Sequence, residues 1–424
     1  EPHDMTTLRH NLVGAAVGNF FEWLDFTLYG YFALAIARNF FPAGNEVLST
    51  LAAVTAFAAG FVVRPFGAWC IGRYADRRGR KAAMVATVLL MGAGTLLIAI
   101  APPYQTAGFL GTAMVVIGRL LSGFAASGES GAAGALVIES CPPHRRGWYG
   151  AVFSASTYLA LAAGSGLALL VFGTLGVERT LDWGWRIGFV VGLCVIPVGA
   201  YLRRHMNESL HAGAMQASGT EARTLPARTL AAQIIMVSAL TGFGSAVVYL
   251  AIVFMPAFAT QALKIGQTTG AIGSTLAALA IIAGSLIGGP WSDRRGRSGI
   301  MLFGIVLALG IGTPLYEHLL ASPTPGALFA FQGACAFGFG LFLGGSFPFF
   351  AERFPPGQRA LGIGLGYNIG VMLFGAASPV VSTYALSQGI VRAPLYYLLA
   401  AAVVSVVAIL CMRKPPVWQR PLIA

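Results

Sequence analysis

Five charged side chains lie inside long apolar stretches of this 424-residue sequence, and they are the first candidates for chemistry. A charged group at the centre of a bilayer costs about 2.5–3.5 kcal/mol on insertion scales, so such residues are rare there and usually functional. No histidine lies deep in these stretches, so a carboxylate is the natural carrier of a proton. The five residues are Glu22, Asp25, Arg64, Arg119 and Glu129.

Glu22 and Asp25 lie three residues apart, so a helix would place both carboxylates on one face. Two neighbouring carboxylates in a medium of low dielectric constant do not both ionise easily, so one of them is expected to bind and release a proton. Glu129 is a third carboxylate of this kind, and these three are the predicted proton-coupling residues. The alternative is that Glu22 and Asp25 only hydrogen-bond to neighbouring helices or pair with an arginine.

The two arginines are candidates for binding an anion. Arg119 can bind a carboxylate through two parallel hydrogen bonds, or it can be a fixed counter-ion of Asp25 or Glu22. Arg64 stands directly before Pro65, and gating or packing explains it as well as substrate binding does. Other polar side chains could complete a substrate site, although those in membrane helices also bond across helices or to their own backbone. These further candidates are Asn19, Tyr29, Tyr158, Tyr249 and Asn368.

The stretches that hold these residues have the length and composition of membrane-spanning helices. The chain is 56% hydrophobic and 10% charged, with a mean hydropathy of +0.74, whereas soluble domains are about 25% charged. A helix crosses a bilayer with about 20 apolar residues, and these runs are too long for barrel strands. The sequence therefore predicts an all-α integral membrane protein with twelve transmembrane helices, at about 12–37, 48–71, 82–101, 107–138, 148–174, 185–203, 229–259, 267–291, 299–320, 325–350, 360–387 and 391–412.

The net charge of +12 is distributed in a way that indicates a membrane topology rather than binding to nucleic acid. Twelve spans place both termini on one side, and the loops of that side carry most of the 27 Lys and Arg residues. Because cytoplasmic loops are the basic ones, both termini are expected in the cytoplasm. The opposite side carries only Arg38, Arg179, Arg186, Lys264 and Arg392.

Two sequence motifs each occur twice and in the same order. The run GRYADRRGRK at 72–81 follows the second predicted span and GPWSDRRGRS at 289–298 follows the eighth, while ESCPPHRRG at 139–147 and ERFPPGQR at 352–359 follow the fourth and tenth. Repeated halves of this kind build transporters whose substrate site lies between the halves near mid-membrane. We therefore expect two pseudo-symmetric six-helix bundles, 1–203 and 229–424, joined by a polar cytoplasmic loop at 204–228.

The run at 72–81 resembles the signature loop of the major facilitator superfamily, and 289–298 is a weaker copy that departs from it at Ser298. Within that superfamily the chain resembles the metabolite:proton symporters, through GNFFEWLDF at 18–26, RPFG at 64–67, GRLLSG at 118–123 and WGWR at 183–186. The resemblance implies the major facilitator fold and a latch that holds the halves together on the cytoplasmic side. Alternatively, the basic runs determine topology only. The latch residues would be Asp76, Arg80, Asp293 and Arg297.

The segment TLLIAIAP at 95–102 looks most similar to the citrate and tricarballylate members. The family's usual glutamine in the fifth span is absent from the corresponding stretch, 154–158, so this cavity position does not identify the substrate. The resemblance implies an alternating-access proton symporter that imports a small organic carboxylate such as citrate, tricarballylate or α-ketoglutarate. The alternatives are a proton symporter of proline or betaine, or a drug/proton efflux antiporter.

An enzyme is not expected, because the sequence offers no Ser/His/Asp grouping, no HExxH and no Walker loop. The five cysteines are far apart and lack metal-ligand spacing, so neither disulfides nor a metal site nor a cofactor is expected. The expected partners are an organic anion, a proton and the lipid bilayer, without nucleic acid. The protein is expected to be a monomer in the bacterial inner membrane.

Overall fold

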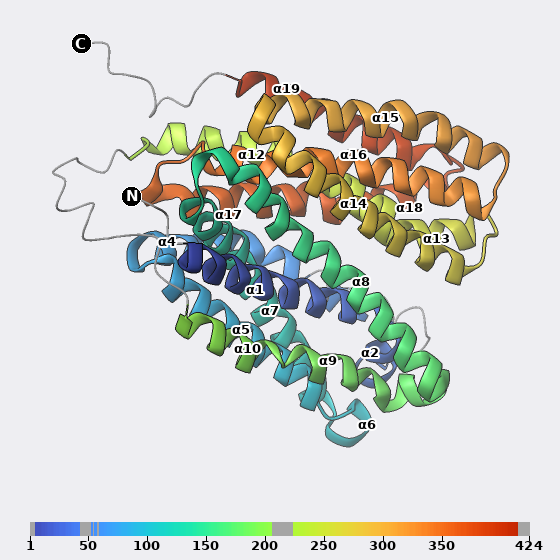
Figure 1. The fold of residues 1–424 in the computed structure, drawn as a ribbon. Helices are drawn as coiled ribbons and strands as arrows, with labels where there is room; N and C mark the ends of the chain where they lie inside the picture. Colours follow the sequence, from blue (N-terminus) through green and yellow to red (C-terminus); the bar gives the residue numbers. More distant parts are fainter. Residues whose placement is uncertain (1–4, 43–51, 54, 57–58, 206–223, 414–424) are drawn as a thin grey trace, which may run out of the picture.

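The architecture is helical throughout the part of the chain that the computed structural model describes, which comprises residues 5–42, 52–53, 55–56, 59–205 and 224–413. No strand occurs within these ranges. Helices satisfy every backbone hydrogen bond within one segment, as hydrocarbon surroundings require. In Figure 1 the helices of the first half, blue to green, gather in the lower part of the view, and those of the second half, yellow to red, gather above them.

The helices of the first half cover parts of the six expected spans. They are α1 (Met5–Tyr31), α2 (Ala33–Phe40), α4 (Arg64–Arg78), α5 (Arg80–Ile100), α6 (Tyr104–Ala107), α7 (Phe109–Ser140), α8 (Arg146–Arg179), α9 (Trp185–Gly192) and α10 (Val195–His205). The second half contains α12 (Ala227–Val247), α13 (Met255–Gln261), α14 (Gln267–Arg295), α15 (Arg297–Ala321), α16 (Pro325–Ala351), α17 (Arg359–Gly370), α18 (Ala377–Ser387) and α19 (Ala393–Cys411). Short 3₁₀ turns, η1 (Pro143–Arg145) and η4 (Pro356–Gln358), precede α8 and α17.

Nine helical segments among the described residues are long and apolar enough to cross a membrane. One of them, 143–205, contains both the fifth and the sixth predicted spans. The first predicted span is not among the nine, and it is the one interrupted by Asn19, Glu22 and Asp25. The second lies partly outside the described residues. The membrane nature of the chain is therefore clear, and the count of twelve spans stays a prediction.

Three helical stretches widen into π-helix, which the apolar pattern did not predict. They are η2 (Thr180–Gly184), η3 (Val248–Phe254) and η5 (Val371–Ala376). π-Helical turns occur frequently at functional sites, because the extra residue changes the direction of the side chains. η3 and η5 carry Tyr249 and Val371, both of which line the central cavity described below.

The signature run at 72–81 is mostly helical, which corrects the expectation of a loop. Helix α4 continues to Arg78, and Gly79 alone breaks the chain direction with φ 105°. Its repeat behaves in the same way, since α14 continues to Arg295 and Gly296 has φ 91°. Gly72 does not form a turn. It lies inside α4, where a Cβ would approach the Cα of Leu361 to 2.7 Å, so this glycine permits close contact with α17.

The two halves pack against each other along several helix pairs. α8 packs on α14 and α16, and α17 packs on α4 and α7 (Figure 1). The predicted loop 204–228 lies mostly outside the described residues, because α10 ends at His205 and residues 206–223 are not described. The boundaries 1–203 and 229–424 therefore stay a prediction.

Candidate functional site

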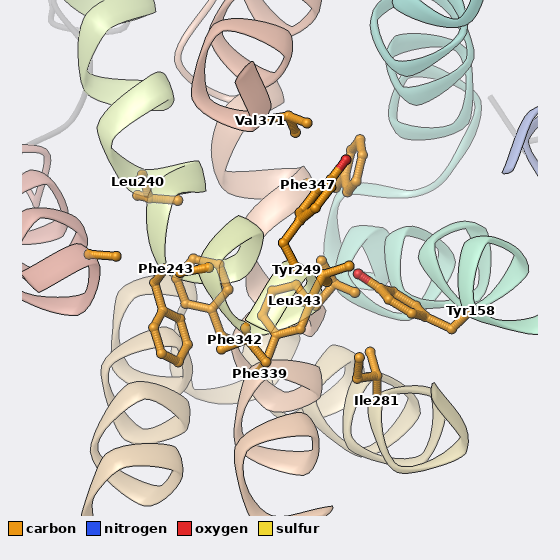
Figure 2. Close-up of a cluster of buried hydrophobic side chains, with 14 of the residues drawn as sticks. Tyr158, Leu240, Phe243, Tyr249, Ile281, Phe339, Phe342, Leu343, Phe347 and Val371 are labelled. Atoms are coloured by element: carbon orange, nitrogen blue, oxygen red, sulfur yellow. The ribbon is translucent and has the colours of Figure 1, made fainter. Parts of the chain in front are cut away.

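A central cavity of about 50 Å³ lies among helices of both halves. Asn19, Tyr158 and Tyr249, three of the predicted substrate-binding residues, line it. Figure 2 shows Tyr158 and Tyr249 beside apolar side chains of α16, with further apolar side chains from α12 and α14 nearby. The remaining wall is polar on α7, α8 and α12 and aromatic on α16, and it includes Trp23, Ser130, Ser154, Thr157, Thr241, Ser245, Phe339, Phe342, Ser346, Phe347 and Tyr367.

A second cavity of about 280 Å³ continues the first along α1, away from the basic end of the molecule. The two share Trp23, Leu161, Val248 and Tyr249. Ligand sites commonly enclose about 300–1,000 Å³, so the central cavity alone is too small for a metabolite in this conformation. Polar contacts between the two halves, described below, lie at the basic end.

Asn19 joins α1 to α8 at the cavity wall. Its amide nitrogen donates to Ser156 Oγ and to Thr157 Oγ1, both at 2.7 Å. Tyr158, the next residue along α8, packs edge-on against Phe339 of α16, with ring centroids 6.1 Å apart. Hydrogen bonds of Asn19 therefore join α1 to α8, and the neighbouring Tyr158 ring contacts the aromatic wall of the second half.

Glu22 forms a buried but loose ion pair with Arg64 of α4. The closest nitrogen and oxygen are 3.6 Å apart, which is beyond ordinary hydrogen-bond distance. Glu22 Oε2 and Arg64 Nε have no hydrogen-bond partner among the described residues. The guanidinium carbon of Arg64 lies 4.4 Å from the ring centre of Phe26 and 4.8 Å from that of Phe61, so aromatic faces stabilise the cation. Because Glu22 and Arg64 leave hydrogen-bonding capacity unused, either side chain could bind a further polar partner.

Asp25 and Arg119 form a tight pair instead. Arg119 Nη1 donates to Asp25 Oδ2 at 2.8 Å, and Thr95 Oγ1 donates to Asp25 Oδ1 at 2.9 Å. The guanidinium of Arg119 also faces the ring of Tyr29 at 4.6 Å, and the Tyr29 hydroxyl donates to the Ala53 carbonyl at 3.1 Å. Of the two interpretations of Arg119, the structure contains the counter-ion geometry. Arg119 and Tyr29 are not among the described residues that line the two cavities, and neither are Glu22 and Arg64.

Glu129 forms the third buried pair, with an arginine at the end of the sixth predicted span that was not among the candidate site residues. Arg203 of α10 places Nη2 3.7 Å from Glu129 Oε2, and Thr87 Oγ1 donates to the same carboxylate oxygen at 2.8 Å. α1 passes so close that a Cβ at Gly18 would lie 2.1 Å from Glu129 Oε1. Arg203 was missed because it is the last residue of its predicted span. That position at the membrane edge was the available signal.

The predicted latch residue Asp76 reaches across to the second half. Its carboxylate accepts from the backbone N–H groups of Ala360 at 3.2 Å and Leu361 at 3.0 Å, in the first turn of α17. Negative charge is favourable at a helix N-terminus, where backbone N–H groups are unpaired. Arg80 also donates to Asp76, and it donates to the Pro356 carbonyl at 2.8 Å.

Glu139 completes this first latch from the end of α7. It accepts from Arg80 Nη2 at 3.1 Å and from Arg359 Nη1 at 2.9 Å. Arg359 begins α17, so the carboxylate is shared between cations of both halves. The repeated motif at 139–147, whose role the sequence left unassigned, therefore supplies a carboxylate that joins cations of both halves.

The second latch has the same design with the halves exchanged. Asp293 of α14 accepts from the backbone N–H groups of Gly147 at 2.8 Å and Trp148 at 3.0 Å, in the first turn of α8. Arg297 donates to Asp293 at 2.5 Å and lies 3.5 Å from Glu352. The sequence repeat is therefore also a repeat of contacts.

Asn368 of α17 bridges the halves nearer the centre. Its amide nitrogen donates to the Ser127 carbonyl at 3.2 Å and to Ser130 Oγ at 3.0 Å, both on α7. Asn368 is fully buried, and Ser130 lines the central cavity. Asn368 therefore reaches the cavity only through Ser130 in this conformation.

Two protein-family models match this chain. The family model "Sugar (and other) transporter" matches residues 12–224, and the model "Major Facilitator Superfamily" matches residues 234–422. The chain belongs to the major facilitator superfamily. It is accordingly a membrane transporter and not an enzyme.

Relatives of this facilitator cover nearly its whole length. The citrate-proton symporter of Klebsiella pneumoniae is 31% identical over 92% of this chain and 88% of its own length. The alpha-ketoglutarate permease of Escherichia coli (strain K12) is 32% identical over 95% of this chain and 93% of its own. The proline/betaine transporter of the same strain is 28% identical over 98% of this chain and 85% of its own.

Solved structures agree with this facilitator in fold. The proton:xylose symporter XylE bound to 6-bromo-6-deoxy-D-glucose aligns with a TM-score of 0.77 at 15% identity, covering 96% of this chain and 95% of that one. A partially occluded inward open form of XylE from Escherichia coli aligns with a TM-score of 0.73 at 13% identity, covering 98% of this chain and 100% of that one. At this level of identity the similarity concerns the fold alone.

Proposed function

We propose that the protein is an alternating-access proton symporter that imports a small organic carboxylate, such as citrate, tricarballylate or α-ketoglutarate, across a bacterial inner membrane. Three relatives that are more than 30% identical are, by their names, two citrate-proton symporters and an alpha-ketoglutarate permease. We also propose that both termini are cytoplasmic, that the two bundles are 1–203 and 229–424, and that the monomer is the working unit.

The observation that carries this proposal is the loose Glu22–Arg64 pair beside the central cavity. Asn19 and Trp23, the neighbours of Glu22 on α1, line the cavity, while the pair itself lies just behind them with unused hydrogen-bonding capacity. A proton on Glu22 would remove the charge that holds Arg64 and leave the guanidinium able to turn toward a carboxylate in the cavity. Substrate and proton would then support each other's binding.

Coupling of this kind is a difference in binding energy between two conformations. In the conformation described here the contacts of Asp76 and Asp293 join the two halves at the basic end. Release of the proton would restore the Glu22–Arg64 attraction and weaken the hold on the substrate carboxylate. Asp25 and Glu129 are the other candidates for the proton, and the tight partners of Asp25 make it the weaker candidate of the two.

A second candidate function is proton symport of a zwitterion such as proline or betaine. The cavity wall is rich in aromatic rings, including Trp23, Tyr158 and Tyr249. Aromatic faces bind quaternary ammonium groups through cation–π interactions. A zwitterion would use these rings for its cation and Arg64 for its carboxylate.

The test is transport current in proteoliposomes on a supported membrane, with citrate, tricarballylate, α-ketoglutarate, proline and betaine, each with and without an inward proton gradient. We expect a gradient-dependent current with a carboxylate. Glu22→Gln should retain substrate exchange and lose accumulation driven by the gradient, whereas Glu178→Gln, at a side chain that is 80% exposed, should behave as wild type. Accumulation that survives in Glu22→Gln would remove Glu22 from coupling, and a current with proline or betaine alone would favour the zwitterion.

A further inference from the structure

A groove of about 500 Å³ lies between α5 and α10, at the basic end of the first half. These two helices run side by side in the lower left of Figure 1. Three cations, Lys81, Arg203 and Arg204, line one end of the groove. None of the transport steps proposed above uses this groove.

The rest of the groove is apolar and faces outward. Val85 and Leu89 of α5 are 37% and 59% exposed, and Ile196 of α10 lies opposite them. In a chain that crosses the membrane, an exposed apolar face of this kind meets lipid hydrocarbon. The cations stand where such a face reaches the level of the lipid headgroups.

Arg203 provides independent evidence that the groove takes an anion. Its side chain is 4% exposed, and Nη1 and Nη2 have no hydrogen-bond partner among the described residues. The carboxylate of Glu129 is 3.7 Å away, too far for a hydrogen bond. A buried guanidinium whose donors are unused is costly unless another acceptor satisfies them.

We propose that this groove binds one anionic phospholipid, with the phosphate on Lys81, Arg203 and Arg204 and an acyl chain along Leu89 and Ile196. Basic pockets between transmembrane helices on the cytoplasmic side are known to hold anionic headgroups, and the charge and the apolar face of this groove fit both parts of such a molecule. The phosphate would supply acceptors for the unused donors of Arg203. A lipid of the surrounding membrane would thus contact a cation that also faces a buried carboxylate of the transporter.

The test is native mass spectrometry of the full-length protein in detergent, titrated with dioleoyl-phosphatidylglycerol. Dioleoyl-phosphatidylcholine and sn-glycerol 3-phosphate are the comparison ligands. We expect one retained phosphatidylglycerol, and weaker binding of the other two. The double variant Lys81→Gln/Arg204→Gln should lower the affinity about 25-fold, since each basic residue near the membrane surface contributes about fivefold. Ala200→Trp, which fills the groove without changing charge, should also lower it.

The matched control is Arg294→Gln/Arg295→Gln, because these two arginines are exposed at the corresponding end of the repeated motif in the second half. The control should bind phosphatidylglycerol as wild type does. Equal losses in both double variants would mean general attraction to basic loops and would overturn the proposal. Equal retention of the two lipids, or glycerol phosphate binding as tightly as the lipid, would also overturn it, the latter in favour of a site for a soluble anion.

Discussion

Replacing Asp76 with asparagine should open the basic end of the protein. In the conformation described here, the two carboxylate oxygens of Asp76 each accept a backbone N–H from the first turn of α17, at 3.2 and 3.0 Å. These bonds join α4 of the first half to α17 of the second. Asparagine has almost the same shape but offers one acceptor oxygen, and its amide group would point donors at a backbone N–H.

The substitution should therefore remove at least one hydrogen bond to a charged acceptor. Such a bond contributes about 1.5–3 kcal/mol in a buried site, and the Asp76 side chain is only 6% exposed, so solvent screening is small. The equilibrium between the closed and the open basic end should shift by about 10- to 150-fold toward the open form. Asp293→Asn should act similarly, because Asp293 caps α8 with the same geometry.

The assay is the distance between spin labels at positions 78 and 295, which are exposed at the ends of α4 and α14. The five native cysteines would first be replaced. Asp76→Asn should increase the population with longer distances, whereas Asp182→Asn, at an exposed position of η2, should leave the distribution unchanged. An unchanged distribution in both Asp76→Asn and Asp293→Asn would refute the latch.

Two further predictions concern the buried carboxylates. Gly18→Ala should displace the Glu129 carboxylate, because the new Cβ would lie 2.1 Å from Oε1, and the pH midpoint of substrate uptake should therefore move. The control is Gly166→Ala, whose new Cβ would have no atom within 4 Å. Equal pH midpoints in the two variants would contradict this reasoning. Asp25→Asn should lower the free energy of unfolding by about 3–5 kcal/mol, because it leaves the buried charge of Arg119 uncompensated. The double variant Asp25→Asn/Arg119→Gln should regain part of this loss, as measured by thermal unfolding in detergent. A double variant no more stable than Asp25→Asn would count against a stabilising Asp25–Arg119 ion pair.

The sequence alone was sufficient to predict a helical membrane protein of the major facilitator type. Long apolar runs can be read without knowing their neighbours, because in lipid each helix satisfies its own backbone. The repeat of 72–81 at 289–298 could be read directly from the order of residues. Asp76 and Asp293 were expected to lie in latches through a family resemblance. The structure places them at the first turns of α17 and α8, which the sequence did not predict, and their role in gating stays a prediction.

Only the tertiary structure decided which charge faces which. Glu22 lies with Arg64, Asp25 with Arg119, and Glu129 with Arg203. These pairs join residues far apart in the chain, and their geometry depends on how each helix is rotated about its axis and how deep it lies in the membrane. A helix surrounded by other helices is apolar on all sides, so its sequence pattern does not specify that rotation or depth.

The π-helical segments η3 and η5 are a second feature that the sequence did not reveal. Each adds one residue to a helical turn and thereby directs Tyr249 and Val371 toward the cavity. Such a change depends on packing against neighbouring helices, since the apolar runs at 229–259 and 360–387 continue without a visible break. The sequence determined which residues could perform the chemistry, and helix packing decided which of them meet, because an ion pair in lipid requires two helices to present their charges at the same depth.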